Sequence, residues 1–213
     1  MSASFGPERD IFALPPSAPG MRIGLFGGSF NPPHEGHALV SRESLKRLGL
    51  DAVWWLVTPG NPLKDHSELA PLAERVGAAR ALVAHPRVHV TGYEAGRGFA
   101  YTYDTLAHLR TVLPGRRLVW MMGADSLANF HRWERWEDIF TLMPIAVYVR
   151  PGSTRRATFA RAALRFADSR LAEADARLLP TSPAPAWVLV HGMMSSLSST
   201  AIRQGQVGAA RQG

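Results

Sequence analysis

A loop rich in glycine and histidine follows the first apolar run of the chain, and its residue types suit phosphate chemistry. Its sequence is G-G-S-F-N-P-P-H-E-G-H, from Gly27 to His37. Paired glycines let the backbone approach a ligand closely, and the free N–H groups at the start of the next helix attract an anion. His34 and His37 are three residues apart, so both can face one side of the first helical turn. The loop is best interpreted as a phosphate site to which two imidazoles donate.

Other kinds of site fit this loop less well. A Walker A loop requires G-K-[ST] and a dinucleotide fingerprint requires G-x-G-x-x-G, and the loop has neither. An H-E-x-x-H zinc site fails because the second histidine arrives one residue early and no other ligand cluster is evident. The alternative that stays open is a pair of histidines that only caps the helix.

A second candidate phosphate site lies near the C-terminus, in L-S-S-T-A-I-R. Ser199 and Thr200 place hydroxyl groups at a predicted helix N-terminus, where four backbone N–H groups also lack helical partners. Arg203, one turn further, has a planar guanidinium suited to two phosphate oxygens. Lys64, at the end of a proline-braced loop, supplies a mobile positive charge. With no Ser–His–Asp arrangement apparent, these donors predict catalysis by positioning and charge neutralisation.

Alternating strands and helices must position these loops. Continuous apolar runs rich in Val, Leu and Ile are typical of buried parallel strands, and their alternation with helices predicts one Rossmann-like, doubly wound α/β domain with a mostly parallel sheet. Ligands bind such sheets at the C-terminal ends of the strands. We expect about six strands, over 22–26, 52–57, 88–91, 117–122, 145–149 and 187–190, and helices over 36–48, 67–84 (capped by Ser67), 102–112, 134–140, 154–167 and 198–204.

The rest of the chain sets the boundaries of this domain. Residues 1–20 contain several prolines and predict a disordered arm, residues 21–205 form the domain, and residues 206–213 are a tail. No apolar run approaches the roughly 18 residues that a membrane helix needs, and the N-terminus lacks the features of a signal peptide. We therefore expect a cytoplasmic protein without a membrane partner.

Composition excludes several classes of protein. The 213 residues include no cysteine, which excludes a disulfide scaffold, a thiolate nucleophile, a zinc finger and an iron–sulfur cluster. The formal net charge is +7, yet only two of the 24 basic residues are lysines, which indicates a codon bias as much as a binding face. Five arginines between Arg155 and Arg170 favour a solvated helix face, with a phosphate-rich partner as the alternative. We expect no nucleic-acid partner.

Two motifs in the right order resemble a known superfamily. The loop that ends in H-E-G-H and the segment L-S-S-T-A-I-R, about 160 residues later, resemble the first and last signatures of the nucleotidyltransferases. Within that superfamily, three middle segments resemble nicotinate-nucleotide adenylyltransferases: W-L-V-T-P-G-N-P-L-K from Trp55, T-Y-D-T-L from Thr102, and G-A-D-S-L-A-N-F-H-R-W from Gly123. The resemblance covers roughly residues 21–205.

The resemblance implies adenylyl transfer from ATP to nicotinate mononucleotide, with Mg²⁺ held mainly by the ATP phosphates and water. It assigns the phosphate chemistry to His34, His37, Lys64 and Arg203. The other ATP contacts implied are Gly27, Gly28, Ser29, Phe30, Ser199 and Thr200.

The same resemblance implies how the mononucleotide is bound. Trp133 stacks on the pyridine ring, Thr102 meets the nicotinate carboxylate and Tyr101 lines the pocket. Asp125 accepts a hydrogen bond from a ribose hydroxyl or, as the alternative, caps the next helix. Asp104 either contacts the mononucleotide or caps and orients its own loop, and the sequence favours neither. Trp120 is expected in the core and Trp136 in helix packing. The competing functions are a relative with another acceptor, such as nicotinamide mononucleotide or phosphopantetheine, and a non-catalytic basic α/β module that binds nucleic acid or a nucleotide.

Overall fold

A parallel β-sheet forms the centre of the protein. The computed structural model describes residues 11–60, 69–149 and 157–192, and in this part the sheet has seven strands in the order β3-β2-β1-β4-β5-β7-β6. Every adjacent pair is parallel. The strands are β1 (Arg22–Gly28), β2 (Ala52–Val57), β3 (Val88–Thr91), β4 (Arg117–Gly123), β5 (Ile145–Tyr148), β6 (Arg170–Leu171) and β7 (Trp187–Val190). The predicted doubly wound sheet is confirmed.

The sheet has one strand more than the six expected. β6 is only two residues long and pairs with β7 at the edge of the sheet. Arg170 is exposed and Leu171 is half-buried, so this strand carries no apolar run that a sequence pattern could reveal.

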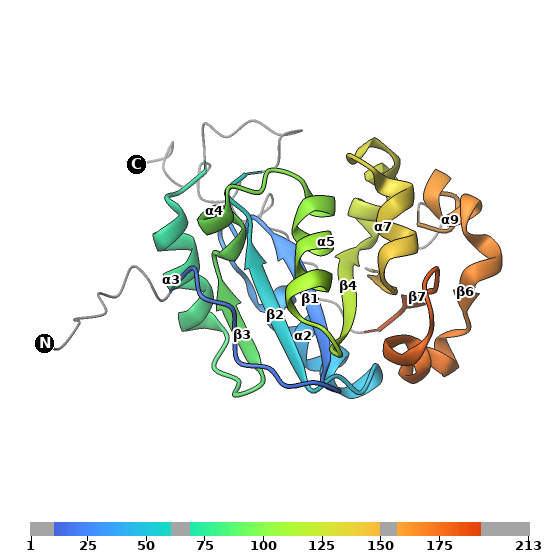
Figure 1. Cartoon of the computed structure of the whole chain (residues 1–213), viewed down its shortest axis with the longest axis horizontal. Helices are drawn as coiled ribbons and strands as arrows, with labels where there is room; N and C mark the ends of the chain where they lie inside the picture. The colour runs from blue at the N-terminus through green and yellow to red at the C-terminus, as the bar shows by residue number, and fades with distance from the viewer. Residues whose placement is uncertain (1–10, 61–68, 150–156, 193–213) are drawn as a thin grey trace, which may run out of the picture.

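Helices cover both faces of the sheet (Figure 1). On one face, α5 (Thr102–Val112), α7 (Trp136–Leu142) and α9 (Arg161–Arg165) bury side chains such as Leu109 and Phe140 against Leu25 and Trp120. On the other face, α2 (Glu35–Arg47), α3 (Leu72–Leu82) and the 3-10 helix η3 (Glu173–Thr181) pack against the opposite set of strand side chains. Shorter helices connect these layers: α4 (Tyr93–Arg97), α6 (Ala124–Asn129), η1 (Phe130–Arg132) and η2 (Ala167–Ser169).

Two predicted helices differ from the observed ones by more than two residues at an end. The helix expected over 67–84 begins at Leu72, because Pro71 fits the start of a helix and keeps the preceding residue out of helical geometry. The predicted cap, Ser67, lies outside the described residues. The helix expected over 154–167 is interrupted, since Ala160 is extended and α9 starts only after it.

The expected disordered arm is wrong for residues 11–20. The Thr91 hydroxyl donates to the carbonyls of Ile11 and Ala13 at 3.1 and 2.8 Å, and Gly92 N–H donates to Ile11 O at 2.6 Å. Further along, Gly20 N–H donates to Gly115 O at 2.8 Å. The segment therefore lies along the edge of the sheet formed by β3. Its proline content predicts disorder. The carbonyls of Ile11 and Ala13 nevertheless accept hydrogen bonds, because a proline ring removes a donor and leaves carbonyl acceptors in place.

Candidate active site

The predicted phosphate loop lies at the point where the sheet reverses its winding. β1 pairs with β2 on one side and with β4 on the other, and later strands continue outward in both directions. Ligands of doubly wound sheets bind at such a point, beyond the C-terminal ends of the strands. β1 ends at Gly28, so the loop begins there.

Packing excludes a side chain at the first glycine of this loop and leaves little room for one at the second. A Cβ on Gly27 would overlap the indole of Trp120, and a Cβ on Gly28 would lie 3.2 Å from the Phe30 ring. Phe30 is 1% exposed, has a left-handed backbone (φ 46°) and stacks on Trp55 with ring centroids 4.7 Å apart. The loop is therefore held in one conformation by the core beneath it.

His34 and His37 come together at the start of α2. His34 is the N-cap residue and is 5% exposed; its backbone N–H donates to His37 Nδ1 at 3.1 Å. The two imidazole rings stack with centroids 3.8 Å apart. Capping, the alternative left open by the sequence, is thus present. Because Nδ1 accepts in this arrangement, a neutral His37 carries its proton on Nε2, which is the tautomer that a phosphate donor needs.

Arg75 holds this loop in place, and the sequence patterns did not single it out. Its side chain is 3% exposed and donates to the backbone carbonyls of Ala70, Ser29 and Thr58 at 2.7, 2.8 and 2.8 Å. Burial lowers the pKa of its guanidinium. One guanidinium therefore ties the first loop to the end of β2. The available signal was an arginine directly beside Val76 on the buried side of an alanine-rich helix.

Glu94, in α4, is a second residue that the patterns missed. It is 6% exposed, and burial raises the pKa of its carboxyl to about 7, while the nearby Thr105 and Thr58 hydroxyl groups oppose part of that rise. Thr58 follows β2 and Thr105 lies in the first turns of α5. The carboxyl group thus lies between the two regions predicted to bind the two substrates.

The residues predicted to bind the mononucleotide follow β4 and begin α5. Tyr101 is 45% exposed and precedes Thr102, the first residue of α5. Trp133 follows η1 and is half-buried, with its ring 4.9 Å from Phe130 and 6.5 Å from Trp120 between centroids. Its outer part is therefore available to a ligand, while its inner part packs on the core.

The structure separates the remaining candidates in this region. Asp125 is exposed at the second position of α6, whose N-cap is Gly123, so the capping alternative for Asp125 is wrong. Trp120 is 2% exposed in β4, and Trp136 packs edge-on against Phe166 at 6.1 Å, which confirms both packing roles.

The last predicted site residues lie outside the described part of the chain. They are Lys64, Ser199, Thr200 and Arg203.

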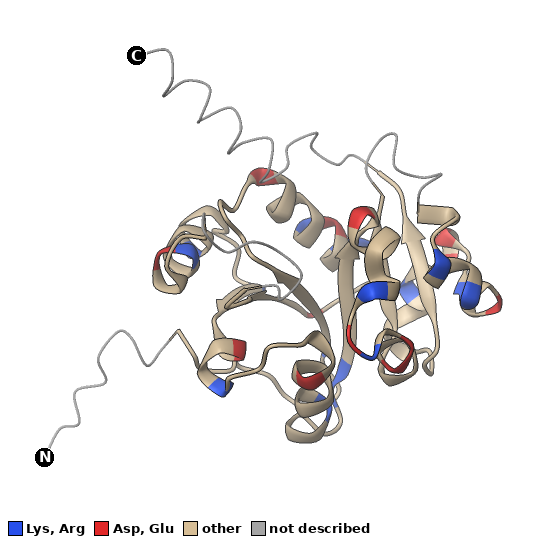
Figure 2. Cartoon of the chain, turned by 90° about the horizontal axis from the view of Figure 1, so that it is seen from above, with Lys and Arg blue, Asp and Glu red and all other residues tan. Residues whose placement is uncertain are grey.

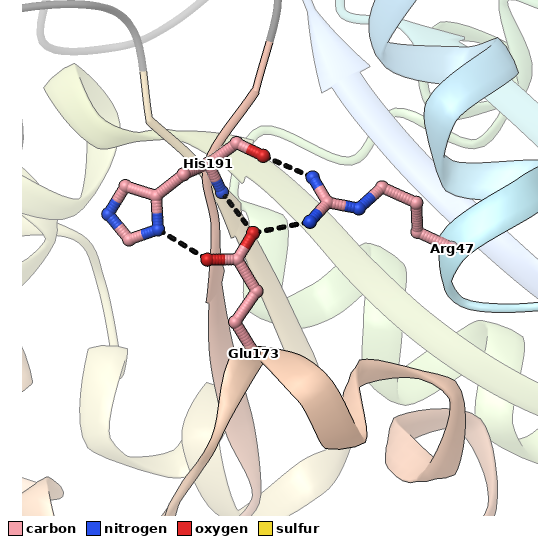
Figure 3. Close-up of polar contacts among 3 residues, drawn as sticks. All are labelled: Arg47, Glu173 and His191. Atoms are coloured by element: carbon pink, nitrogen blue, oxygen red, sulfur yellow. Dashed lines mark hydrogen bonds and ion pairs between the residues drawn. The ribbon is translucent and has the colours of Figure 1, made fainter.

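The strand that leads toward the C-terminal motif, β7, is anchored just beyond its end. His191 N–H donates to Glu173 Oε1 at 2.7 Å, and His191 Nδ1 lies 2.6 Å from Glu173 Oε2 (Figure 3). Arg47 completes the cluster: it donates to Glu173 Oε1 at 2.5 Å and to the carbonyl of His191. Burial alone would raise the pKa of Glu173, but the hydrogen bonds from His191 and Arg47 lower it.

The described residues offer neither a metal site nor a helix that could cross a membrane. No group of three or more His, Asp or Glu side chains in residues 11–60, 69–149 and 157–192 could hold a metal ion. None of the described helices has both the length and the apolar character to cross a membrane. Basic and acidic positions are mixed on the outer helices in Figure 2.

Comparisons with known proteins show the family of this chain. Residues 25–205 match the family described as cytidylyltransferase-like. A "probable nicotinate-nucleotide adenylyltransferase" of Methylorubrum extorquens is 61% identical over 183 residues, 86% of this chain and 99% of the relative. One of Rhizobium leguminosarum bv. trifolii with the same name is 52% identical over 187 residues, 88% of this chain and 97% of the relative.

A solved structure shares the fold at low sequence identity. The Plasmodium falciparum nicotinic acid mononucleotide adenylyltransferase complexed with NaAD superposes with a TM-score of 0.64, covering 85% of this chain and 82% of its own, at 15% identity. On the matched family and the two close relatives, this chain belongs to the cytidylyltransferase-like family and, within it, to the nicotinate-nucleotide adenylyltransferases.

Proposed function

We propose that this protein transfers the adenylyl group of ATP to nicotinate mononucleotide, giving deamido-NAD and pyrophosphate in NAD biosynthesis. A phosphate oxygen of the mononucleotide attacks the α-phosphorus of ATP, and the bond from that phosphorus to the bridging oxygen of the pyrophosphate breaks. The attacking phosphate is already ionised at pH 7, so the reaction needs no general base and no covalent intermediate. It needs positioned donors for the charge that develops.

The observation that carries this proposal is the first loop. His37 sits at the start of α2, its Nδ1 accepting from the backbone at 3.1 Å, in a loop that lies at the switch point of the sheet. Nε2–H can then donate to the α-phosphate, with His34 stacked beside it. Backbone groups of Gly27, Gly28, Ser29 and Phe30 border the same space and would contact ATP.

The remaining roles follow the family motifs. Lys64 and Arg203 neutralise the phosphates, and Ser199 and Thr200 donate to them. On the other side of β1, Trp133 stacks on the pyridine ring, Thr102 and Tyr101 border its carboxylate, and Asp125, exposed after β4, accepts from the ribose.

Mg²⁺ enters with ATP in this proposal and is held by the phosphates and water. The donors gathered at the first loop are imidazoles and backbone N–H groups, which suit phosphate oxygens and leave the cation to the nucleotide. We further propose a cytoplasmic location, where ATP and pyridine nucleotides occur together.

The test is pyrophosphate release from ATP and Mg²⁺ with each of three acceptors in turn. Nicotinate mononucleotide should be used best, ahead of nicotinamide mononucleotide, and phosphopantetheine should not be used. Release only with phosphopantetheine would assign a different transferase, and ATP binding without release from any acceptor would indicate a nucleotide-binding module.

A further inference from the structure

Arg135 has an unusual backbone conformation beside the predicted pyridine platform. It lies two residues after Trp133, is the N-cap of α7 and has left-handed angles (φ 53°, ψ 38°). Among the described residues, Phe30 is the other non-glycine residue with a positive φ, and it lies in the phosphate loop. A left-handed non-glycine residue has a conformational cost and occurs most often where surrounding structure imposes it, frequently at functional sites.

The Arg135 side chain is held over α5. Its Cζ lies 3.7 Å from the centroid of the Tyr103 ring, and its Nε donates to Asp138 Oδ2 at 2.7 Å. In the described part of the chain, Nη1 and Nη2 donate no hydrogen bond. The side chain is 51% exposed. The guanidinium is thus oriented by one ring and one carboxylate. Its two outer nitrogens, which form the end that pairs with a ligand carboxylate, have no hydrogen-bond acceptor among the described residues.

This guanidinium is close to the residues proposed to bind nicotinate. Tyr103 directly follows Thr102, the first residue of the eleven-residue helix α5, and Arg135 follows Trp133. Asp138 and Asp104 are the acidic groups that face Arg135, and together with Tyr103 they raise the pKa of its guanidinium, Asp138 most strongly. The charged form of Arg135 is therefore favoured by its surroundings.

We propose that Arg135 is a specificity-determining residue that favours an acceptor with a carboxylate on the pyridine ring over one with a carboxamide. This proposal rests on the proposed function, because it concerns which mononucleotide is accepted. A carboxylate gains both charge attraction and two acceptor oxygens at the guanidinium. A carboxamide is neutral and brings an NH₂ group that repels the arginine donors.

The test compares the KM values for nicotinate mononucleotide and nicotinamide mononucleotide in variants that keep a long, non-glycine side chain at position 135. Arg135→Gln keeps a long side chain and a non-glycine residue at the left-handed position, but removes the charge. We expect the KM for nicotinate mononucleotide to rise about tenfold, the loss of one charge-assisted contact at a partly exposed site. The kcat and the KM values for ATP and nicotinamide mononucleotide should stay within about twofold, because the residue does not touch the reacting atoms. Arg135→Lys should restore part of the preference.

Two controls separate a charge effect from a loss of packing. Arg165, on α9, has a similar exposed arrangement: its Cζ lies 5.3 Å from the centroid of the Phe166 ring, and its Nε lies 3.8 Å from Glu137 Oε1. Arg165→Gln should therefore leave the preference for nicotinate mononucleotide over nicotinamide mononucleotide unchanged. Salt should weaken the preference of the wild-type protein and leave that of Arg135→Gln nearly constant, since ions screen an exposed charge.

The outcomes that overturn the proposal are distinct. An equal rise of both acceptor KM values in Arg135→Gln would mean that Arg135 only supports the fold of the turn. Unchanged KM values would mean that it has no part in selection. If the wild-type protein does not use nicotinate mononucleotide at all, the proposed function itself fails, and that result is obtained before any variant is made.

Discussion

The two regions proposed to bind the two substrates are built differently. The phosphate loop after β1 rests on buried residues: Phe30 is 1% exposed against Trp55, and Arg75, 3% exposed, fixes the Ser29 carbonyl. The pyridine region rests on partly exposed ones: Tyr101 is 45% exposed, and the Arg135–Asp138 pair is about half exposed on both sides. The first region is an extension of the core, whereas the second is a surface assembled from separate elements.

This difference predicts different consequences of mutation. In the phosphate loop, geometry and stability depend on the same contacts, so most substitutions should reduce both together. In the pyridine region few buried contacts are at stake, so substitutions should alter substrate preference with little loss of stability. Adenylyl transfer uses the same phosphate geometry whatever the acceptor, so a rigid first region and an adjustable second one suit the reaction.

Replacing Arg75 with alanine should have the largest effect, and it tests whether the phosphate loop depends on buried contacts. Three partly buried carbonyls would lose their donor, so we expect the free energy of unfolding to fall by roughly 3 kcal/mol or more, with activity falling in parallel. Urea unfolding followed by circular dichroism measures the change. Arg80→Ala, on the exposed side of the same helix, is the control and should cost less than about 1 kcal/mol. A comparable loss in both variants would show that Arg75 is not a special anchor.

Replacing His37 should separate chemistry from helix capping. His37→Ala should fold and lower kcat by about 10²–10³, the loss expected for one transition-state donor. His37→Asn can still offer an oxygen where Nδ1 accepts from His34 N–H, but has no donor at the Nε2 position. His37→Gln has an amide N–H that can donate near the Nε2 position, but no acceptor at the Nδ1 position.

Activity and stability should therefore diverge in these two variants. Asn should retain the melting temperature without activity, and Gln should recover part of the activity at a lower melting temperature. An alanine variant that is folded and fully active would remove His37 from the mechanism and leave only the cap.

Much of the rigid region could be predicted from sequence, because its signals are local. Apolar runs located the six longer strands, and the spacing of His34 and His37 located their common turn. Arg75 could not be found in this way, since Ser29, the residue it holds, is 46 positions away and the contact exists only after folding. Residues 11–20 illustrate the same limit: their order depends on the β3 edge, about 80 positions along the chain.

Replacing Glu94 should test whether the two regions are coupled, because its carboxyl group lies between Thr58 and Thr105. Burial raises its pKa from 4.5 to about 7, so between these values the folded state binds more protons than the unfolded state. Stability is therefore lost as the pH rises through this window, and above it the buried charge costs roughly 3 kcal/mol.

Glu94→Gln removes that titration. At pH 5 the variant and the wild-type protein should unfold at similar urea concentrations, and at pH 8 the variant should be more stable. Glu74→Gln, at an exposed position of α3, is the control and should leave the pH dependence unchanged. A Glu94→Gln variant whose difference from wild type is constant from pH 5 to 8 would show that the carboxyl stays ionised. If the two regions are coupled, the KM values for both substrates should shift together.

The smallest expected effect is on the adjustable side, at Trp133. If its exposed part stacks on the pyridine ring, Trp133→Ala should weaken nicotinate mononucleotide by about 1–3 kcal/mol, on the scale of base–aromatic stacking, with the KM for ATP nearly unchanged. Its inner part packs 4.9 Å from Phe130, so a modest fall in melting temperature is expected as well. Trp136→Ala is the matched control: Trp136 is also half-buried, but its ring packs on Phe166 at 6.1 Å. That variant should lose stability and keep both KM values. Equal rises of both KM values in Trp133→Ala, with a melting temperature as low as that of Trp136→Ala, would identify Trp133 as a packing residue and make the pyridine region as rigid as the phosphate loop.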